Sequence, residues 1–225
     1  MREVVIDTET TGLDSKGGHR IIEIGGVELV NHVTTGATFH RYIDPERDVD
    51  RGAFEVHGLS REFLANYPSF AEHADAFLEF IAQDDLIIHN APFDIGFINM
   101  ELGRIGRELI SPERLIDTLQ IARRRYPGAQ ASLDALCKRF EIDKSHREQH
   151  GALVDADLLA LVYLELIGGR QPNLELASDP TTVRRDRIET TMINRPVRVY
   201  EVTNNELAAH AALIERITDP IWKRD

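Results

Sequence analysis

The sequence predicts an α/β fold in which a mixed sheet is flanked by helices and followed by a C-terminal tail. Segments 3–9, 21–30 and 37–43 carry apolar and β-forming residues between polar turns, which is typical of an antiparallel meander. Beyond residue 69, short apolar runs alternate with segments of helical spacing. This order favours one mixed sheet whose first three strands are antiparallel and whose faces are covered by helices.

The first third of the chain supplies the expected meander. The opening strand ends at a Thr-Thr-Gly sequence, residues 10–12, which is typical of a turn. The second and third strands are separated by residues 31–36, where we expect Asn31-His32 and Thr34-Thr35-Gly36 to lie in the turn. We expect residues 44–60 to be irregular.

The middle of the chain alternates helices with buried strands. Residues 86–88 are apolar throughout, as in a strand covered on both faces. A helix is expected to follow through about residue 104, with Pro92 in its first turn. Before this strand, residues 69–82 have the spacing of an amphipathic helix, with one apolar stripe formed by Phe70, Ala74, Phe77 and Ile81.

The last elements of the predicted domain are a strand and three helices. The strand is expected at 114–118, and helices follow at 119–126 and 132–140, the second capped by Ser132. The longest apolar helix is expected over 150–167. Its end is set by the glycine pair at 168–169, which stops a helix.

The character of the sequence changes at residue 171. We therefore expect a domain over residues 1–170, a polar linker over 171–196 and a tail segment over 197–225. Within the tail, residues 197–202 alternate like a strand and residues 205–217 have helical spacing.

Composition limits the possible classes of protein. Of the 225 residues, 42% are hydrophobic and 28% charged, as in a soluble globular protein, and no apolar run is long enough to span a membrane. The chain starts without the basic and apolar regions of a signal peptide, and Cys137 is its single cysteine, which fits a cytoplasmic location. The formal net charge of −12 argues against tight nucleic-acid binding unless bound cations or a partner protein compensate.

Two acidic residues follow the apolar core of the opening strand. Asp7 and Glu9 are two residues apart, so their side chains point to the same face. Neighbouring carboxylates repel, and a hard divalent cation such as Mg²⁺ or Mn²⁺ between them would relieve that repulsion. A solvated acidic turn, or the phosphatase pattern of an Asp nucleophile followed by a second acid, would also account for the pair.

More acidic residues occur at the ends of later elements. Asp94 begins a helix directly after a buried strand, where it would also suit the helix dipole. Asp155 lies within the most apolar helix, where a carboxylate needs a compensating partner. Asp157 is nearly as enclosed, and periodicity does not choose between the two. His150, about 140° of helical rotation from Asp155, is expected at the rim of the site rather than beside it, as a base or as an exposed histidine.

Three segments together resemble the DEDDh 3′–5′ exonucleases. They are Asp7-Thr-Glu9-Thr-Thr-Gly, His89-Asn-Ala-Pro-Phe-Asp94 and His150-Gly-Ala-Leu-Val-Asp155. Within that family, nearly the whole chain resembles the proofreading epsilon subunits of bacterial DNA polymerase III. The resemblance implies a ribonuclease-H-like fold and a 3′–5′ DNA exonuclease that proofreads the primer terminus and releases nucleoside 5′-monophosphates by two-metal-ion hydrolysis.

The resemblance also implies roles for particular residues. Asp7, Glu9 and Asp155 would bind two Mg²⁺ or Mn²⁺ ions, Asp94 would reach a metal through water, and His150 would be the general base. Asp7, Glu9 and Asp155 would also contact the substrate, and further positions near the terminal nucleotide are Thr10, Leu13, His57 and Asn90.

One position departs from the epsilon pattern, which has a glutamate five residues before His57. Here that position is Gly52, and Glu55 is the acidic residue that would have to replace it.

The C-terminal region resembles segments that bind replication proteins. Residues 171–176 resemble a sliding-clamp-binding peptide with contacts from Gln171, Leu174 and Leu176, although a plain linker is the alternative. Residues 197–222 resemble the segment that binds the alpha subunit of DNA polymerase III, although they could instead pack on the chain's own domain. A DNA 3′ terminus and a small accessory subunit complete the implied partners, and no membrane is implied.

Two other functions remain open on the sequence alone. A related DEDDh nuclease that trims RNA ends or oligonucleotides would carry the same acidic residues. A non-catalytic replication scaffold would keep the fold, but we expect it to have lost an acid or the histidine, and none is missing.

Overall fold

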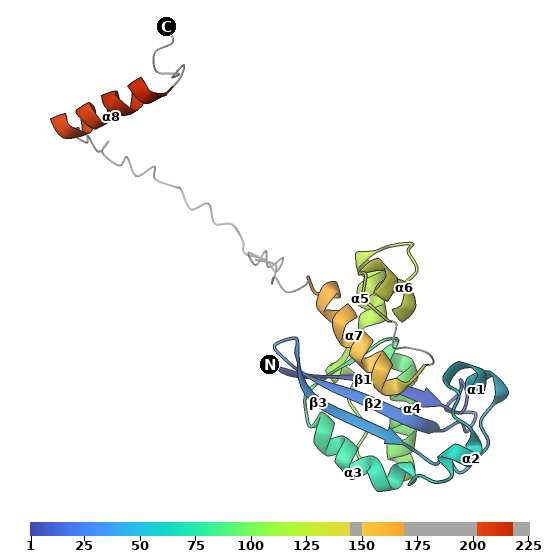
Figure 1. Ribbon diagram of the computed structural model, residues 1–225. Coiled ribbons are helices and arrows are strands. Elements are labelled where there is room, and N and C mark those ends of the chain that lie inside the picture. The colour runs from blue at the N-terminus through green and yellow to red at the C-terminus, as the bar shows by residue number, and fades with distance from the viewer. Residues whose placement is uncertain (145–149, 169–201, 218–225) are drawn as a thin grey trace, which may run out of the picture. The chain divides into compact units, whose positions relative to one another are not determined.

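The computed structural model describes residues 1–144, 150–168 and 202–217. By contacts the chain divides into two units, residues 1–174 and 175–225, and the division falls among residues outside the described ranges. In the first unit, helices cover both faces of a twisted sheet (Figure 1).

Within the described part of the chain, five strands form one sheet in the order β3-β2-β1-β4-β5. The strands β1 (Arg2–Thr10), β2 (Ile21–Val30) and β3 (Val33–Tyr42) are antiparallel. The short strands β4 (Asp85–Ile88) and β5 (Leu115–Asp117) are parallel to β1. The predicted mixed sheet is therefore confirmed, and β1 lies at its centre.

The turn between β2 and β3 is shorter than the sequence predicted. We expected residues 31–36 to form it, but β3 already begins at Val33. Asn31 and His32 take positive φ angles of 51° and 64°, so two residues suffice to reverse the chain. Asn tolerates the left-handed conformation, which makes so tight a connection possible. The register of the β2–β3 pair shifts between Val27 and Leu29.

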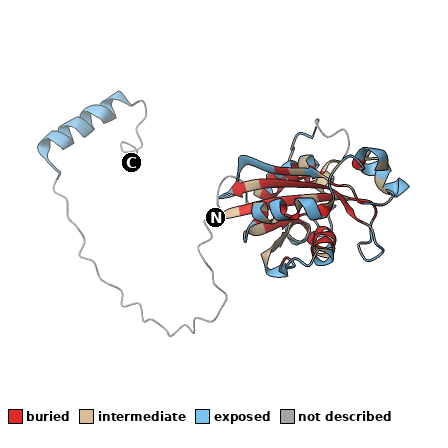
Figure 2. Cartoon of the chain, turned by 90° about the horizontal axis from the view of Figure 1, so that it is seen from below, coloured by how far each residue is buried: buried red, intermediate tan, exposed pale blue. Residues whose placement is uncertain are grey.

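The two faces of the sheet pack against different helices. Val5 and Val27 point to the face covered by α7 (Ala152–Leu166), where Ala156, Leu159 and Tyr163 contact them. Figure 2 shows buried residues both along the strands and on the helices that pack against them. The alternation of β1 therefore decides which side chains meet α7. The opposite face packs against α3 (Phe70–Ile81) and α4 (Ala91–Arg104), through a cluster that includes Val4, Ile6, Phe77, Phe97 and Ile98.

Local sequence signals set where these helices begin. Ser69 and Glu72 form a capping box at the start of α3, and Pro92 lies in the first turn of α4. Ser132 accepts a hydrogen bond from the Ala135 N–H, which confirms the predicted cap. The helices α5 (Thr118–Arg125) and α6 (Leu133–Arg139) complete the group near the predicted bounds.

The expectation of an irregular segment over residues 44–60 holds for 44–50 and 58–60 but is wrong for 51–57. Helix α1 spans Arg51–His57 and ends at Gly58, whose φ of 74° is the left-handed conformation common after helices. A further helical turn, α2, spans Arg61–Leu64. At seven residues α1 offers too few turns for its apolar spacing to stand out, so the sequence pattern did not reveal it.

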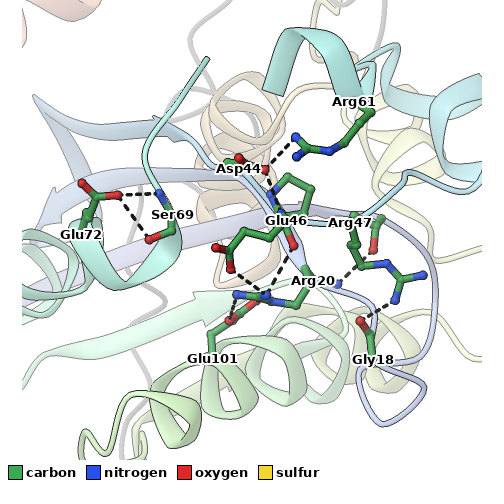
Figure 3. Close-up of polar contacts among 11 residues, drawn as sticks. Gly18, Arg20, Asp44, Glu46, Arg47, Arg61, Ser69, Glu72 and Glu101 are labelled. Carbon is green, nitrogen blue, oxygen red and sulfur yellow. Dashed lines mark hydrogen bonds and ion pairs between the residues drawn. The ribbon is translucent and has the colours of Figure 1, made fainter. Parts of the chain in front are cut away.

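A buried ion pair connects α4 to the start of β2 (Figure 3). Arg20 donates from Nε and Nη2 to the two carboxylate oxygens of Glu101, at 2.6 and 2.9 Å. Arg20 Nη1 donates to the Pro45 carbonyl at 3.3 Å and lies 3.6 Å from a carboxylate oxygen of Glu46. The backbone of the same arginine accepts from the Thr11 N–H at 2.9 Å. Arg20 thus connects α4, the 44–46 segment and the residues directly after β1.

The described part of the second unit contains one helix, α8 (Asn204–Arg216). Its start is a capping box formed by Thr203 and Glu206, and it confirms the helix expected over 205–217. The predicted strand at 197–202 lies outside the described residues except for Val202. None of the helices in the described ranges combines the length and apolarity that crossing a bilayer requires.

Candidate active site

The carboxyl-terminal end of β1 carries two acidic side chains on one face of the sheet. In the antiparallel register, Asp7 pairs with Gly25 and Glu9 pairs with Glu23 of β2. Since side chains alternate along a strand, Asp7 and Glu9 share the face on which Val5 packs against α7. Both acids are half-buried. The predicted pairing of two carboxylates on one face is therefore present.

A third acid reaches the end of β1 from α4. Asp94 lies in the first turn of α4 and is 4% exposed. Its Oδ1 accepts two hydrogen bonds from Thr8, one from the hydroxyl at 2.7 Å and one from the backbone N–H at 3.1 Å. Burial raises the pKa of Asp94 to about 7, and the hydrogen bonds from Thr8 oppose this rise.

The fourth acid and the histidine come from the start of α7. Asp155 is 4% exposed, and its Oδ2 lies 3.2 Å from His150 Nδ1. Glu9, His150 and Asp155 each place one potential ligand atom within 4.8 Å of the others. Asp157, the alternative to Asp155, is exposed to solvent. Geometry thus brings Asp155 to the acidic cluster, whereas periodicity alone left both candidates open.

The expectation that His150 lies away from Asp155 is wrong. That expectation assumed a helix from residue 150, but α7 begins at Ala152 and the preceding Gly151 is extended, with φ −148° and ψ 130°. Helical rotation therefore does not apply between His150 and Asp155. The histidine side chain is 42% exposed, so it lies at the edge of the site and still contacts the buried carboxylate.

The electrostatics of the cluster fit bound divalent cations. The pKa of Asp7 is raised well above its ordinary value, first by burial and then by the negative charges of Asp94, Glu9, Asp155 and Glu23. Carboxylates that disfavour one another's ionisation are stabilised when a cation lies among them. The acidic side chains offer carboxylate oxygens, the ligand type that hard divalent cations take.

A cavity of about 390 Å³ opens beside Glu9. Its polar wall includes Thr10, whose hydroxyl donates to the Gly12 carbonyl at 2.7 Å, and His57. Burial lowers the pKa of His57, so this ring is neutral near pH 7. The cavity is lined by Thr8, Glu9, Thr10, Gly12, Leu13, Asp50, Gly52, Ala53, Val56, His57 and Phe93.

The predicted substrate-binding residues separate into two groups. Thr10, Leu13 and His57 line this cavity together with Glu9. Asn90 does not line it, and instead begins α4 in a left-handed conformation with φ 66° and ψ 53°. Its backbone N–H donates to Asp117 Oδ1 at 3.2 Å, so its position is set by the end of β5.

Gly52 and Glu55 are not equivalent in the structure. Gly52 lines the cavity, and a Cβ added there would have no atom within 4 Å. Glu55 is absent from the lining and accepts a hydrogen bond from Arg51 Nε at 2.9 Å, at the exposed surface. The glutamate side chain therefore points to a different environment from the one next to Gly52.

Sequence reasoning overlooked two residues of the site. Thr8 lies between the two acids and was assigned no role from the sequence. Strand alternation directs it toward the face that α4 covers, which was the signal for its contact with Asp94. Phe93 lines the cavity and packs against Phe97 with ring centroids 5.1 Å apart. Its position directly before Asp94 was the available signal, because both belong to the first turn of α4.

Gln171, Leu174 and Leu176, the predicted clamp-binding residues, lie outside the described residues. Their role therefore stays a prediction.

Comparisons with known proteins agree with this site. A family model described as Exonuclease (RNase_T) matches residues 4–163. The DNA polymerase III subunit epsilon of Rickettsia conorii is 48% identical over 224 residues, covering 96% of both chains. The protein of the same name from Escherichia coli K12 is 45% identical over 229 residues, covering 96% of this chain and 93% of the relative.

Solved structures support the same fold at lower identity. The nuclease domain of 3′hExo, a DEDDh family member bound to rAMP, matches with a TM-score of 0.63 and 18% identity, covering 74% of this chain and 91% of that chain. Exonuclease I matches with a TM-score of 0.67 and 18% identity, covering 76% of this chain and 41% of that chain. These likenesses confirm the ribonuclease-H-like arrangement of sheet and helices.

Proposed function

This chain belongs to the exonuclease family, among the DNA polymerase III epsilon subunits, and we propose that it proofreads the primer terminus during replication by 3′–5′ hydrolysis. One observation carries the proposal most strongly. Acidic residues from β1, α4 and α7 meet at one end of the central strand, next to a cavity large enough for a small ligand. Such an arrangement suits chemistry at the end of a polynucleotide chain.

We assign cation binding to the acidic residues of this cluster. Asp7, Glu9 and Asp155 would hold two divalent ions, Mg²⁺ or Mn²⁺, and Asp94 would act through a water molecule. Such ions supply positive charge that stabilises the transition state of phosphodiester hydrolysis. The raised pKa of Asp7 and the closely spaced ligand atoms of Glu9 and Asp155 support this assignment.

His150 would act as the general base. Its Nδ1 faces Asp155 Oδ2 at 3.2 Å, and this contact orients the ring. The proton of the attacking water would then pass to Nε2, the other ring nitrogen. Because the side chain is 42% exposed, the proton has a short route from the ring to solvent.

The cavity beside Glu9 would receive the terminal nucleotide of the substrate strand. Leu13, Val56 and Phe93 provide apolar surface against which an unstacked base can pack, while Thr10 and His57 provide polar groups. We place Asn90 near the same nucleotide as a more distant contact. Unpairing the primer end costs least where it is mismatched. A site that takes an unpaired end therefore removes mismatched nucleotides preferentially, without reading the identity of the base.

We also propose partners for the C-terminal region. Residues 197–225 would bind the alpha subunit of the polymerase, and residues 171–176 would bind the sliding clamp through Gln171, Leu174 and Leu176. Helix α8 supports the first proposal, because Leu207 and Leu213 are 54% and 55% exposed along a well-capped helix. A small accessory subunit would bind the catalytic domain, and the assembly would act in the cytoplasm.

The test is digestion of a 5′-labelled DNA primer–template carrying one 3′ mismatch, in Mg²⁺, beside an RNA oligonucleotide of equal length. We expect stepwise shortening of the DNA that is faster at the mismatch and absent in the Asp7→Ala variant. Adding the purified polymerase subunit should increase the rate on the primer–template, because tethering raises the local concentration of the nuclease.

Different outcomes would change the assignment. Preferential digestion of RNA would favour the RNA-trimming alternative and leave the partner proposals without support. If a folded protein cleaved neither substrate in Mg²⁺ or Mn²⁺, the scaffold alternative would replace the enzyme.

A further inference from the structure

Gly25 of β2 lies where α7 comes closest to the sheet. A Cβ built on Gly25 would lie 2.2 Å from the carbonyl carbon and oxygen of Ala152 and 2.3 Å from the backbone nitrogen of Leu153. Real Cβ atoms essentially never approach other heavy atoms within 3.0 Å. Because the contacted atoms are backbone, a side chain at this position cannot be accommodated by rotating a neighbouring side chain.

The contacted backbone belongs to the helical turn that carries an acid of the site. Ala152 is the first residue of α7, and the Asp155 N–H closes this turn by donating to the Gly151 carbonyl at 2.9 Å. Any movement of the turn away from the sheet therefore moves Asp155 with it.

The strand side of the contact is equally close to the site. Gly25 is the direct partner of Asp7 in the β1–β2 register. The same residue thus lies next to one acid in the sheet and directly beneath the turn that carries another. The distance between Asp7 and Asp155 depends on how deeply α7 sits on Gly25.

We propose that Gly25 is a positioning residue for the cation site, because its missing side chain lets the first turn of α7 sit at the depth that brings Asp155 to Asp7. The proposal rests on the cation-binding role assigned above. It predicts that a methyl group at residue 25 displaces Asp155 from Asp7 and weakens cation binding while the rest of the sheet stays folded.

Gly26, the next residue, provides a matched control on the opposite face. A Cβ there would lie 2.7 Å from Phe80 Cε1, 3.2 Å from Ile6 Cδ1 and 3.3 Å from Phe39 Cβ. The closest of these atoms is the far end of the Phe80 side chain, which belongs to α3 and packs against the core on that face. Gly26→Ala therefore disturbs packing without touching α7.

The experiment compares the metal-free, full-length wild type with Gly25→Ala and Gly26→Ala, without DNA. Mn²⁺ affinity is measured by titration calorimetry well below the thermal unfolding midpoint of each variant. We expect Gly25→Ala to bind Mn²⁺ roughly 10- to 100-fold more weakly, the usual range when residues that orient metal ligands are changed. Gly26→Ala is expected to unfold at a lower temperature and to bind Mn²⁺ within about twofold of wild type, since its methyl group lies on the other face.

Equal Mn²⁺ affinities in folded Gly25→Ala and wild type would overturn the proposal, and so would an equal loss in Gly26→Ala. Should Gly25→Ala not fold, Ala156→Val provides a second variant. Ala156 lies one turn further along α7 and is fully buried against the sheet, so a larger side chain there pushes the helix away from the sheet. Unchanged affinity in that folded variant would likewise overturn it. Because the readout is binding, a wild type that binds Mn²⁺ but fails to cleave DNA would refute the proposed function and leave this test intact.

Discussion

The hydroxyl of Thr8 donates to the carboxylate of Asp94 and so joins the end of β1 to the first turn of α4. Thr8 points to the face covered by α4, whereas its neighbours Asp7 and Glu9 point to the face covered by α7. Its two hydrogen bonds hold Asp94 Oδ1 at 2.7 and 3.1 Å, next to the strand that carries the other acids. Thr8 is therefore the connection by which an acid from the far side becomes part of the cluster.

Replacing Thr8 with Val should make Asp94 harder to ionise. The variant keeps the shape of the side chain but removes a hydrogen bond that lowers the pKa of Asp94 from the value burial alone would give. A hydrogen bond to a charged group contributes about 1.5–3 kcal/mol, so the acid limb of the pH–rate profile should move upward by roughly one pH unit or more. The Mg²⁺ concentration for half-maximal rate should rise as well.

Thr8→Ser is the matched control for this prediction, because it retains the hydroxyl and loses only a methyl group. Its pH–rate profile should lie close to that of wild type. If the Val and Ser variants shifted equally, altered packing at residue 8 rather than loss of the hydrogen bond would be responsible.

The metal-free protein should lose stability as the pH rises through the range in which Asp94 ionises. The folded-state pKa is about 7, raised from 3.8 chiefly by burial, so the folded state holds this proton more tightly than the unfolded state. The stabilisation of the folded state by the Asp94 proton is fully present below about pH 4 and is lost as the pH approaches and passes 7. The change should be on the order of 2–4 kcal/mol, measured as the difference in urea unfolding between wild type and Asp94→Asn.

Mg²⁺ provides the check on that interpretation. A cation favours the ionised carboxylates, so saturating Mg²⁺ should remove most of the loss at about pH 7 and have little effect near pH 4. A difference between wild type and Asp94→Asn that stayed constant from about pH 4 to 8 would contradict the raised pKa.

Two acids on α7 offer a direct test of the assigned site. Asp155 is 4% exposed and contacts His150, whereas Asp157, half a turn further on, is exposed. Asp155→Asn should reduce kcat on single-stranded DNA by roughly 10³-fold, since a metal ligand contributes several kcal/mol to the transition state. Asp157→Asn should stay within about twofold, and equal losses in the two variants would refute the assignment.

The short-range part of this site was predictable from the sequence. Strand alternation places Asp7 and Glu9 on one face wherever β1 lies, and Asp94 follows from the strand–helix junction before it. The choice between Asp155 and Asp157 could not be made, because α7 is apolar nearly all round and has no dominant face. The packing of α7 on the sheet, which periodicity does not report, decides which acid is buried.

Two features of the site could not be predicted from the periodicity of the sequence. The contact between His150 and Asp155 exists because Gly151 is extended, which no periodicity reports. The short helix α1 supplies Gly52 and Val56 to the cavity, and a helix of seven residues leaves too little pattern to recognise.

The buried pair of Arg20 and Glu101 should be far more costly to break than an exposed pair. Their side chains are 10% and 2% exposed, so Glu101→Gln leaves the guanidinium without a full counter-charge inside the protein (Figure 3). We expect the free energy of unfolding in urea to fall by about 3 kcal/mol, with a rise in the Mg²⁺ requirement because α4 also carries Asp94. Glu55→Gln is the control: its partner Arg51 is 92% exposed, and the expected loss is below about 0.5 kcal/mol. Comparable losses in the two variants would mean that Arg20 finds sufficient compensation from Glu46 and the Pro45 carbonyl, which lie 3.6 and 3.3 Å away.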